Sequence, residues 1–272
     1  MERIEDVVAD ARTVEAERDG ADTHGGGPAL RFSHLTFAYP GRDPVLRDVS
    51  FDVQPGEVVA VVGPTGGGKS TLGLLLARLW EPPTGTVFLD GNDVTTLTLG
   101  RLRASLAWVP QDAFLFSRGL GDNVTLGRES ITSADVERAA TMAGIADEVG
   151  SFPAGWDTVV GERGLTLSGG QRQRVALARA LGGTPPILVL DDVFANVDAA
   201  KETEILATLR EAAPTILLMT HRLRAAQAAD RIVVLDEGRV VEIGTHADLL
   251  ARDRLYARLW RMQRLEEEIA RA

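Results

Sequence analysis

The sequence contains no cysteine, which excludes disulfide bonds and thiolate metal sites. No stretch of it approaches the roughly 18 consecutive apolar residues that a membrane-spanning helix needs. The first six residues, Met1 to Asp6, are charged and lack the apolar centre of a signal peptide. A formal net charge of −10 at pH 7 argues against nucleic acid as a major ligand. These absences leave an acidic globular protein as the expected class.

The composition that is present supports this class. The chain has 272 residues, enough for one large domain or two small ones, of which 44% are hydrophobic and 25% charged. Residues 1–28 are predicted to form a short helix and a polar linker, because Gly20 to Pro28 is rich in residues that break regular structure.

Apolar runs of strand length alternate with helical patterns along most of the chain, which indicates a parallel sheet covered by helices. The run Val58 to Val62 is continuous, as expected of a strand buried on both faces. Between residues 112 and 167 the strand signals become sparse and helical patterns replace them. The predicted strands are 30–32, 35–37, 45–53, 58–62, 87–89, 106–109, 187–190, 215–219 and 232–235, and the predicted helices are 71–80, 170–181, 199–212, 222–229 and 246–272.

A glycine-rich segment follows the run 58–62 and matches the phosphate-binding consensus G-x-x-x-x-G-K-[ST] in the strand–loop–helix context that this motif requires. Its glycines allow backbone N–H groups to converge on phosphates. Lys69 would supply charge for the β- and γ-phosphates, and the Ser70 hydroxyl would bind Mg²⁺. The alternative is a tight glycine turn without a ligand. The predicted loop comprises Gly63, Pro64, Thr65, Gly66, Gly67, Gly68, Lys69, Ser70 and Thr71.

The apolar run 187–190 ends in Asp191. A buried strand of this kind can deliver a carboxylate to the magnesium shell, usually through water. Such a pattern is common by itself, and it becomes informative only beside the phosphate loop.

A five-residue run, Leu167-Ser168-Gly169-Gly170-Gln171, begins 98 residues after Lys69. With the phosphate loop it resembles the signature of ATP-binding cassette (ABC) proteins, and the likeness covers about residues 30–262. Gly161-Glu162-Arg163-Gly164 resembles a segment found in exporters, and Glu2-Arg3-Ile4 resembles the connector after an exporter's last transmembrane helix. The resemblance implies the nucleotide-binding domain of an ABC exporter, belonging to a longer polypeptide with a membrane domain. A separately encoded ATPase subunit is the alternative.

The resemblance also implies roles for single residues. Tyr39 would stack on adenine, and Gln111 in the Q-loop would reach Mg²⁺ and hinge the helical insertion. His221 in the H-loop would contact the γ-phosphate, and Asp198 would belong to the D-loop. Taken alone, each has an ordinary alternative as a strand aromatic, a loop residue or a structural histidine.

The fold implied is α/β: a P-loop NTPase (RecA-like) core with a mostly parallel sheet, an N-terminal antiparallel β subdomain and an inserted α-helical subdomain. The implied cofactors are ATP and Mg²⁺, and the implied place is the cytoplasmic face of a membrane, bound to the transmembrane domain. The expected boundaries are 1–28 for the connector, 29–265 for the nucleotide-binding domain, 29–111 and 168–245 for its core, 112–167 for the insertion and 246–272 for C-terminal helices.

The signature lies where a helix begins, and such a helix start suits an anion. Ser168 offers a hydroxyl, and Gly169 and Gly170 offer N–H groups, with Gln171 completing the family's set. These groups cannot easily serve the chain's own phosphate loop, whose phosphates are already surrounded. We therefore expect a head-to-tail two-fold dimer with each ATP between one chain's loop and the other's signature.

The sequence departs from the family at Asp192, where active members usually have the glutamate that acts as general base. The reference pKa of aspartate is about 0.4 units lower, worth only roughly 0.5 kcal/mol. Its carboxylate is withdrawn by about 1.5 Å, and a 1 Å misplacement can cost ~10²-fold, about 2.7 kcal/mol. We therefore expect slow hydrolysis at the chain's own site.

Two further departures agree with this expectation: Phe194-Ala195-Asn196-Val197-Asp198 in the D-loop, and Val159 where exporters commonly have an acidic residue. Together they favour one half of a heterodimeric exporter, while a slow homodimer remains open. A regulatory ATP-binding module without transport is a second class. A soluble ABC protein acting on DNA or ribosomes is a third, disfavoured by the acidic charge, the short spacing and the single cassette.

Overall fold

The computed structural model describes residues 29–161, 167–211 and 215–271. The predicted linker 1–28, including Glu2-Arg3-Ile4, and the residues Glu162, Arg163 and Gly164 lie outside the described part of the chain.

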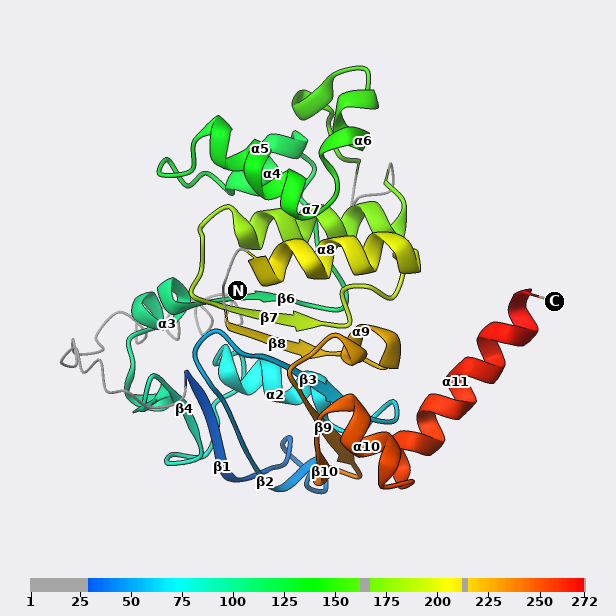
Figure 1. Ribbon diagram of the computed structural model, residues 1–272. Helices are drawn as coiled ribbons and strands as arrows, with labels where there is room; N and C mark the ends of the chain where they lie inside the picture. Colours follow the sequence, from blue (N-terminus) through cyan, green and yellow to red (C-terminus); the bar gives the residue numbers. More distant parts are fainter. Residues whose placement is uncertain (1–28, 162–166, 212–214, 272) are drawn as a thin grey trace.

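A six-stranded sheet in the order β10-β9-β3-β8-β7-β6 forms the centre of the molecule (Figure 1). Neighbouring strands from β9 to β6 are parallel, and β10 pairs antiparallel with β9. Leu188 and Leu190 of β7 pack into one core and Ile187 and Val189 into another, which explains why these four consecutive residues are all apolar. The strands are β3 (Val58–Val62), β6 (Leu106–Val109), β7 (Ile187–Asp191), β8 (Thr215–Met219), β9 (Arg231–Asp236) and β10 (Arg239–Gly244).

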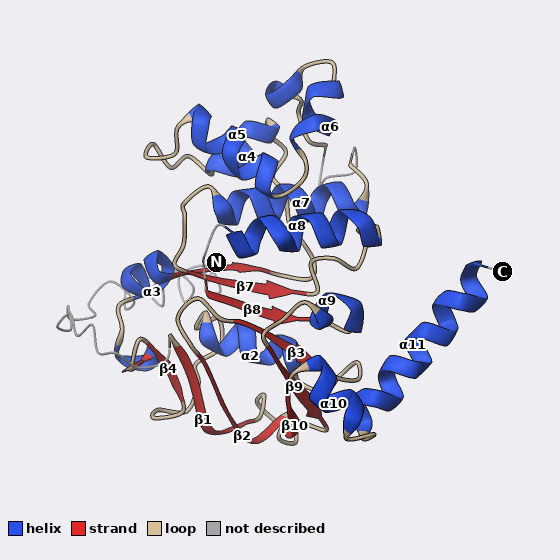
Figure 2. Cartoon of the chain, in the orientation of Figure 1, coloured by secondary structure: helices blue, strands red, loops and turns tan. Residues whose placement is uncertain are grey.

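A smaller sheet in the order β2-β1-β4-β5 is antiparallel. Helix α2 (Lys69–Leu76) lies between the two sheets (Figure 2), and its Leu72, Leu75 and Leu76 share one buried cluster with residues of both. The small sheet thereby holds the start of α2 against the central sheet. Its strands are β1 (Leu30–Phe37), β2 (Leu46–Val53), β4 (Val87–Leu89) and β5 (Asn92–Asp93), followed by a 3₁₀ turn (Val94–Thr96) and α3 (Leu99–Ser105).

The opposite face of the central sheet is covered by α7 and α8, and α4, α5 and α6 lie beyond α7 (Figure 2). We call α4, α5 and α6 the helical layer. One buried cluster runs from the helical layer through α7 to the sheet. The helices are α4 (Leu120–Thr125), α5 (Ser133–Met142), α6 (Ala146–Ser151), α7 (Gly169–Leu181) and α8 (Ala199–Glu211), with a 3₁₀ turn at Gly155–Asp157.

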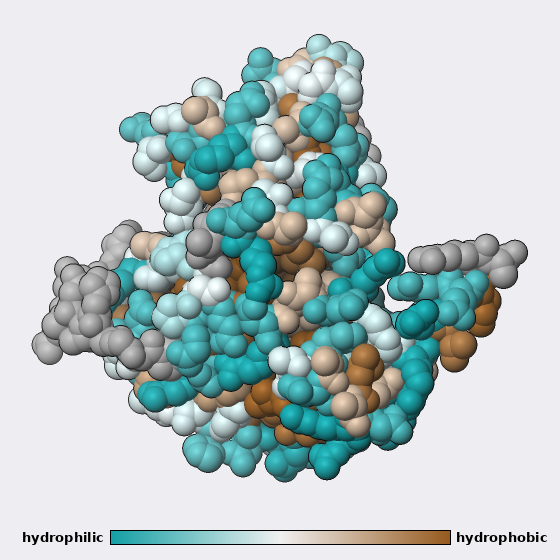
Figure 3. Space-filling model, in the orientation of Figure 1, coloured by the Kyte–Doolittle hydropathy of each residue, from teal (hydrophilic) through white to brown (hydrophobic). Residues whose placement is uncertain are grey.

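The chain continues through α9 (Leu223–Gln227) and α10 (His246–Ala251) and ends in α11 (Leu255–Arg271), which projects from the body (Figure 1). The first turns of α11 pack on α9 and β9, where Tyr256 is fully buried. Apolar side chains face solvent on its distal half (Figure 3), where Met262 and Leu265 are more than half exposed. No helix in the described ranges combines the length and apolar character needed to cross a membrane.

The structure confirms the predicted fold class and corrects several element boundaries. The helix predicted over 71–80 is α2, which ends at Leu76 because the amides of Leu79 and Trp80 both bond back to the Leu74 carbonyl. The predicted helix 246–272 is broken near Asp253, whose φ is 51°. Strand β10 and helix α3 were not predicted from the sequence.

Candidate nucleotide site

The carboxyl ends of β3, β7 and β8 meet at one edge of the central sheet, which is where open α/β sheets bind ligands. A cleft of about 330 Å³ opens there. Most of the predicted loop and both strand-end aspartates border it, together with Val45, which the sequence analysis missed. The lining residues are Val45, Thr65, Gly66, Gly68, Lys69, Ser70, Thr71, Gln111, Asp191, Asp192 and His221.

The phosphate loop is tightly seated on strand β9. Gly63 has a φ of 149°, and a Cβ at this position would lie 1.9 Å from the Leu235 carbonyl oxygen, so only glycine fits. The Lys69 amine donates to the carbonyls of Gly63 and Pro64, both at 2.9 Å. Burial lowers the pKa of Lys69, and the charges of Asp192 and Asp191 oppose that shift. The loop therefore carries a cation that is poorly solvated and surrounded by backbone, as a phosphate cradle requires.

The expected magnesium ligands lie together. The Ser70 hydroxyl donates to Asp191 Oδ1 at 3.0 Å, and Asp191 is 4% exposed. Burial raises the pKa of the Asp191 carboxyl, although the Ser70 hydrogen bond and the Lys69 charge oppose this. A hydroxyl and a carboxylate are the hard oxygen donors that Mg²⁺ prefers, so these residues fit the ion.

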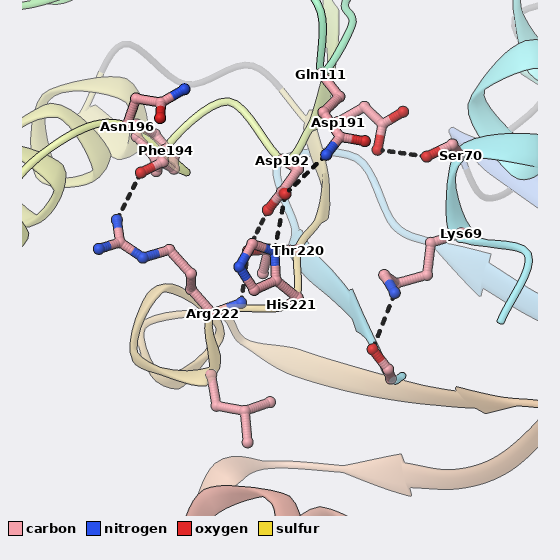
Figure 4. A network of polar contacts seen from close by, with 12 residues as sticks. Lys69, Ser70, Gln111, Asp191, Asp192, Phe194, Asn196, Thr220, His221 and Arg222 are labelled. Atoms are coloured by element: carbon pink, nitrogen blue, oxygen red, sulfur yellow. Dashed lines mark hydrogen bonds and ion pairs between the residues drawn. The ribbon is translucent and has the colours of Figure 1, made fainter. Parts of the chain in front are cut away.

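Asp192 is bonded to three side chains around it (Figure 4). Its Oδ2 accepts from His221 Nδ1 at 2.8 Å and from Gln111 Nε2 at 3.4 Å, and its Oδ1 accepts from the Thr220 hydroxyl at 3.3 Å. Its backbone has a φ of 51° and its amide donates to the Met219 carbonyl at 2.7 Å. The short side chain is therefore held against the Q-loop and the H-loop in this structure.

Arg222 connects the H-loop to the D-loop, and the sequence analysis missed this role. Its guanidinium donates to the carbonyls of Phe194 and Val197, at 2.5 and 2.9 Å, and to Glu202 at 2.6 Å. Glu202 is 3% exposed, so the pair is an almost buried ion pair. The sequence shows an arginine directly after the H-loop histidine, but it does not show that the partners of this arginine lie in the D-loop and in α8.

The signature does not border the cleft in the described part of the chain. Ser168 Oγ accepts from the Gln171 amide at 3.2 Å, and Gln171 Oε1 accepts from the Ser168 amide at 2.8 Å. This reciprocal pair starts α7. A Cβ on Gly170 would lie 2.5 Å from the Asn196 carbonyl oxygen, so glycine lets the D-loop pack against the signature helix.

Two predicted residues have structural contacts at the margin of the site. The Tyr39 hydroxyl lies 3.2 Å from Thr71 Oγ1, and its ring packs edge-on against Trp80. Asp198 Oδ1 accepts from the amides of Ala200 and Lys201 at 3.1 and 2.9 Å, and these bonds lower the pKa of Asp198. Asp198 therefore caps α8 within its own chain.

Comparison with known proteins agrees with this geometry. The family model described as ABC transporter matches residues 46–195. An ATM1-type heavy metal exporter of Novosphingobium aromaticivorans is 45% identical over 241 residues, which cover 88% of this chain and 40% of that protein. An ATP-dependent lipid A-core flippase of Nitrosococcus oceani is 42% identical over 257 residues, covering 93% and 43%.

A solved structure of a bacterial Atm1-family ABC exporter with ATP bound matches with a TM-score of 0.83 and 41% identity, over 96% of this chain and 47% of that one. The chain thus spans less than half the length of these relatives.

The fold and the cleft define a P-loop nucleotide-binding protein of the α/β class. The chain belongs to the ABC transporter family and corresponds to the ATP-binding ATPase domain of its exporters. The predicted family and the predicted ATP cofactor are thereby confirmed.

Proposed function

We propose that the chain is the motor domain of an ABC exporter at the cytoplasmic face of a membrane, and that it works in a head-to-tail pair with a second cassette. The separation of cleft and signature carries this proposal. The cleft holds Lys69, Ser70 and Asp191, whereas Ser168 and Gly170 lie outside it. Because the signature does not border the chain's own cleft, a second chain would be needed to bring a signature to the bound nucleotide.

The described residues suit distinct tasks in this motor. Lys69 and the loop amides would bind the ATP phosphates, and Ser70, Asp191 and Gln111 would hold Mg²⁺, directly or through water. The ion would neutralise charge between the β- and γ-phosphates. His221 would orient the γ-phosphate end, and the signature of a partner would close over it. Binding that favours the closed pair would pass the motion to membrane helices.

The parts of the chain would divide accordingly. Residues 29–111 and 168–245 would form the ATPase core, 112–167 the inserted helical subdomain, 1–28 the connector to the membrane domain and 246–272 the C-terminal helices. The parallel sheet and the helical layer, which lies beyond α7, support this division. The relatives are named for different cargoes, one as a heavy metal exporter and another as a lipid A-core flippase, so we propose no particular substrate.

We further propose that the chain's own site hydrolyses ATP slowly and that its natural partner is a different cassette with a glutamate at the position of Asp192. The carboxylate of Asp192 borders the cleft but accepts hydrogen bonds from His221, Thr220 and Gln111. Asn196 in the D-loop and Val159, which is 64% exposed, also depart from the family pattern. A homodimer with slow turnover is the alternative.

Replacing Asp192 with Glu tests this proposal. The longer side chain would reach about 1.5 Å further, and we expect ATP turnover to rise at least tenfold, because a 1 Å error at a reacting centre costs ~10²-fold. Asp192→Asn is the control, with unchanged ATP binding and no gain in turnover. Brisk turnover by the unmodified chain, or no effect of Asp192→Glu, would contradict the slow-site proposal.

A further inference from the structure

The C-terminal helix α11 makes a direct contact with the backbone of the H-loop. Gln263, on the exposed middle part of α11, donates from Nε2 to the carbonyl of His221. Its Oε1 accepts from the amide of Leu223 at 2.9 Å. One side chain therefore bonds the residues on both sides of Arg222, although 40 or more positions separate it from them.

These bonds give hydrogen-bond partners to two backbone groups of the H-loop, the His221 carbonyl and the Leu223 amide. Leu223 is the first residue of α9, and Arg222, which precedes it, makes no side-chain cap there. The Arg222 guanidinium is directed to the D-loop carbonyls instead. The first amides of a helix need partners from outside the helix. Gln263 supplies one from a distant helix, so α11 caps α9.

His221 is held at two points, through its side chain and through its backbone carbonyl. The His221 side chain is 50% exposed and is held on one side through Nδ1 by Asp192. Its backbone carbonyl is held on the other side by Gln263. Beside this contact, residues of α11 line a cavity of about 310 Å³, which His221, Arg224 and Glu202 also line. Gln263 bridges that cavity, and one turn further along α11 Glu267 pairs with Arg224 at 3.8 Å.

We propose that Gln263 is a positioning residue that fixes the H-loop, so that α11 sets the orientation of His221 at the nucleotide. This inference rests on the proposed role of His221 at the γ-phosphate. It implies that whatever binds or shifts α11 would change turnover without changing the phosphate loop. ATP binding and the positioning of His221 would then be separable.

The test compares four variants of the 272-residue chain. Gln263→Leu removes both bonds, Gln263→Lys keeps a donor for the His221 carbonyl, and Gln263→Glu keeps only the acceptor for the Leu223 amide. Met262→Ala is the matched control, because Met262 is its neighbour on α11 and is 57% exposed. Turnover is measured in an Asp192→Glu background, and ATP binding is measured directly by equilibrium titration.

We expect Gln263→Leu and Gln263→Glu to lower kcat about tenfold with ATP affinity within twofold, because a 1 Å error costs ~10²-fold and the loop would shift by less. Gln263→Lys and Met262→Ala should retain turnover. The ring-nitrogen resonances of His221, assigned with His221→Gln, should respond to ATP in the unmodified chain and respond less in Gln263→Leu. Amide exchange of Leu223 should rise in Gln263→Leu and stay protected in Gln263→Glu.

Each outcome bears on one claim. If ATP binds and shifts the His221 signal equally in Gln263→Leu and the unmodified chain, the positioning role is wrong. If Gln263→Leu lowers kcat and Gln263→Lys does not restore it, a positioning role through the His221 carbonyl is also wrong. If the unmodified chain binds ATP without any response of His221, the proposed function of His221 fails, independently of Gln263.

Discussion

The nucleotide cleft and the signature end of the chain are built in opposite ways. The cleft lies at the ends of strands whose residues are almost wholly buried, and its polar side chains are hydrogen-bonded to one another, as Ser70 is to Asp191 and His221 to Asp192. The signature begins a helix, and the exposed Ser168 exchanges two hydrogen bonds with Gln171 in the same turn. The side chains of the cleft are thus tied together across distant segments of the chain, whereas the signature is held by local bonds at the start of a helix.

Glycine serves different purposes at the two ends. Gly63 is required by a left-handed backbone and by contact with a strand of the central sheet. Gly170 is required by contact with the D-loop, at the Asn196 carbonyl. A change at the first disturbs the chain's own phosphate loop, and a change at the second disturbs the packing of the D-loop on the signature helix, which we propose faces a partner. The two ends can therefore be tested separately.

The largest effect is expected at Lys69. Replacing it with Ala removes the only lysine or arginine among the described residues that line the cleft. Charge-assisted bonds contribute about 1.5–3 kcal/mol each, so we expect ATP binding to weaken ~10²-fold. Equilibrium titration with ATP measures this. Lys201→Ala is the matched control, because Lys201 lies outside the cleft and its amine pairs with the exposed Glu204, so this variant should bind ATP normally.

An intermediate effect is expected at the signature. In Gly170→Asp, a side chain would meet the Asn196 carbonyl and place negative charge at the start of α7, where an anion should bind. We expect hydrolysis by the pair to fall ~10²-fold while ATP binding to the single chain changes less than threefold. Gly150→Asp, at an exposed glycine of α6 with open space around it, is the control. Equal loss of binding and hydrolysis in Gly170→Asp would argue against the head-to-tail arrangement.

The smallest effect is expected in the helical layer. Hydrogen bonds from the Thr132 side chain, from Arg138 and from the Thr132 amide lower the pKa of Asp135 from 3.8 to about 2. A lowered folded-state pKa adds stability above the unfolded pKa, and this stability is lost as pH falls from 3.8 towards 2. We expect Asp135→Asn to reduce the free energy of unfolding slightly at neutral pH and to flatten this acid dependence.

Chemical denaturation at pH 7, 4 and 2.5 measures this dependence. Thr132→Ala should change it in the same direction but by less, because it removes the two bonds of the Thr132 hydroxyl and keeps those that the Thr132 amide and Arg138 donate to Asp135. ATP binding at the cleft should be unchanged in both variants. A loss of ATP binding would show that the helical layer and the cleft are not independent.

Much of the cleft was predictable because its residues are clustered in short motifs. The loop 63–71 is contiguous, and Asp191 and Asp192 end an apolar strand, so sequence order and local periodicity were enough. Val45, Thr220 and Arg222 were missed because their contacts are made across segments, as between Arg222 and the Phe194 carbonyl. The break between α10 and α11 was missed because the pattern of apolar residues over 246–272 does not indicate that Asp253 has a left-handed backbone conformation.

The sequence by itself determined the chemistry of this protein: a phosphate loop, a strand-end carboxylate, a signature and an aspartate where the family has glutamate. These depend on residue type and on order along the chain. Only the tertiary structure decided that Asp192 is held by His221 and Thr220, that the signature stays outside the cleft, and that Gln263 reaches the H-loop. Such contacts join residues tens of positions apart, and their partners are selected by packing of the sheet and helices, which periodicity along the chain does not encode.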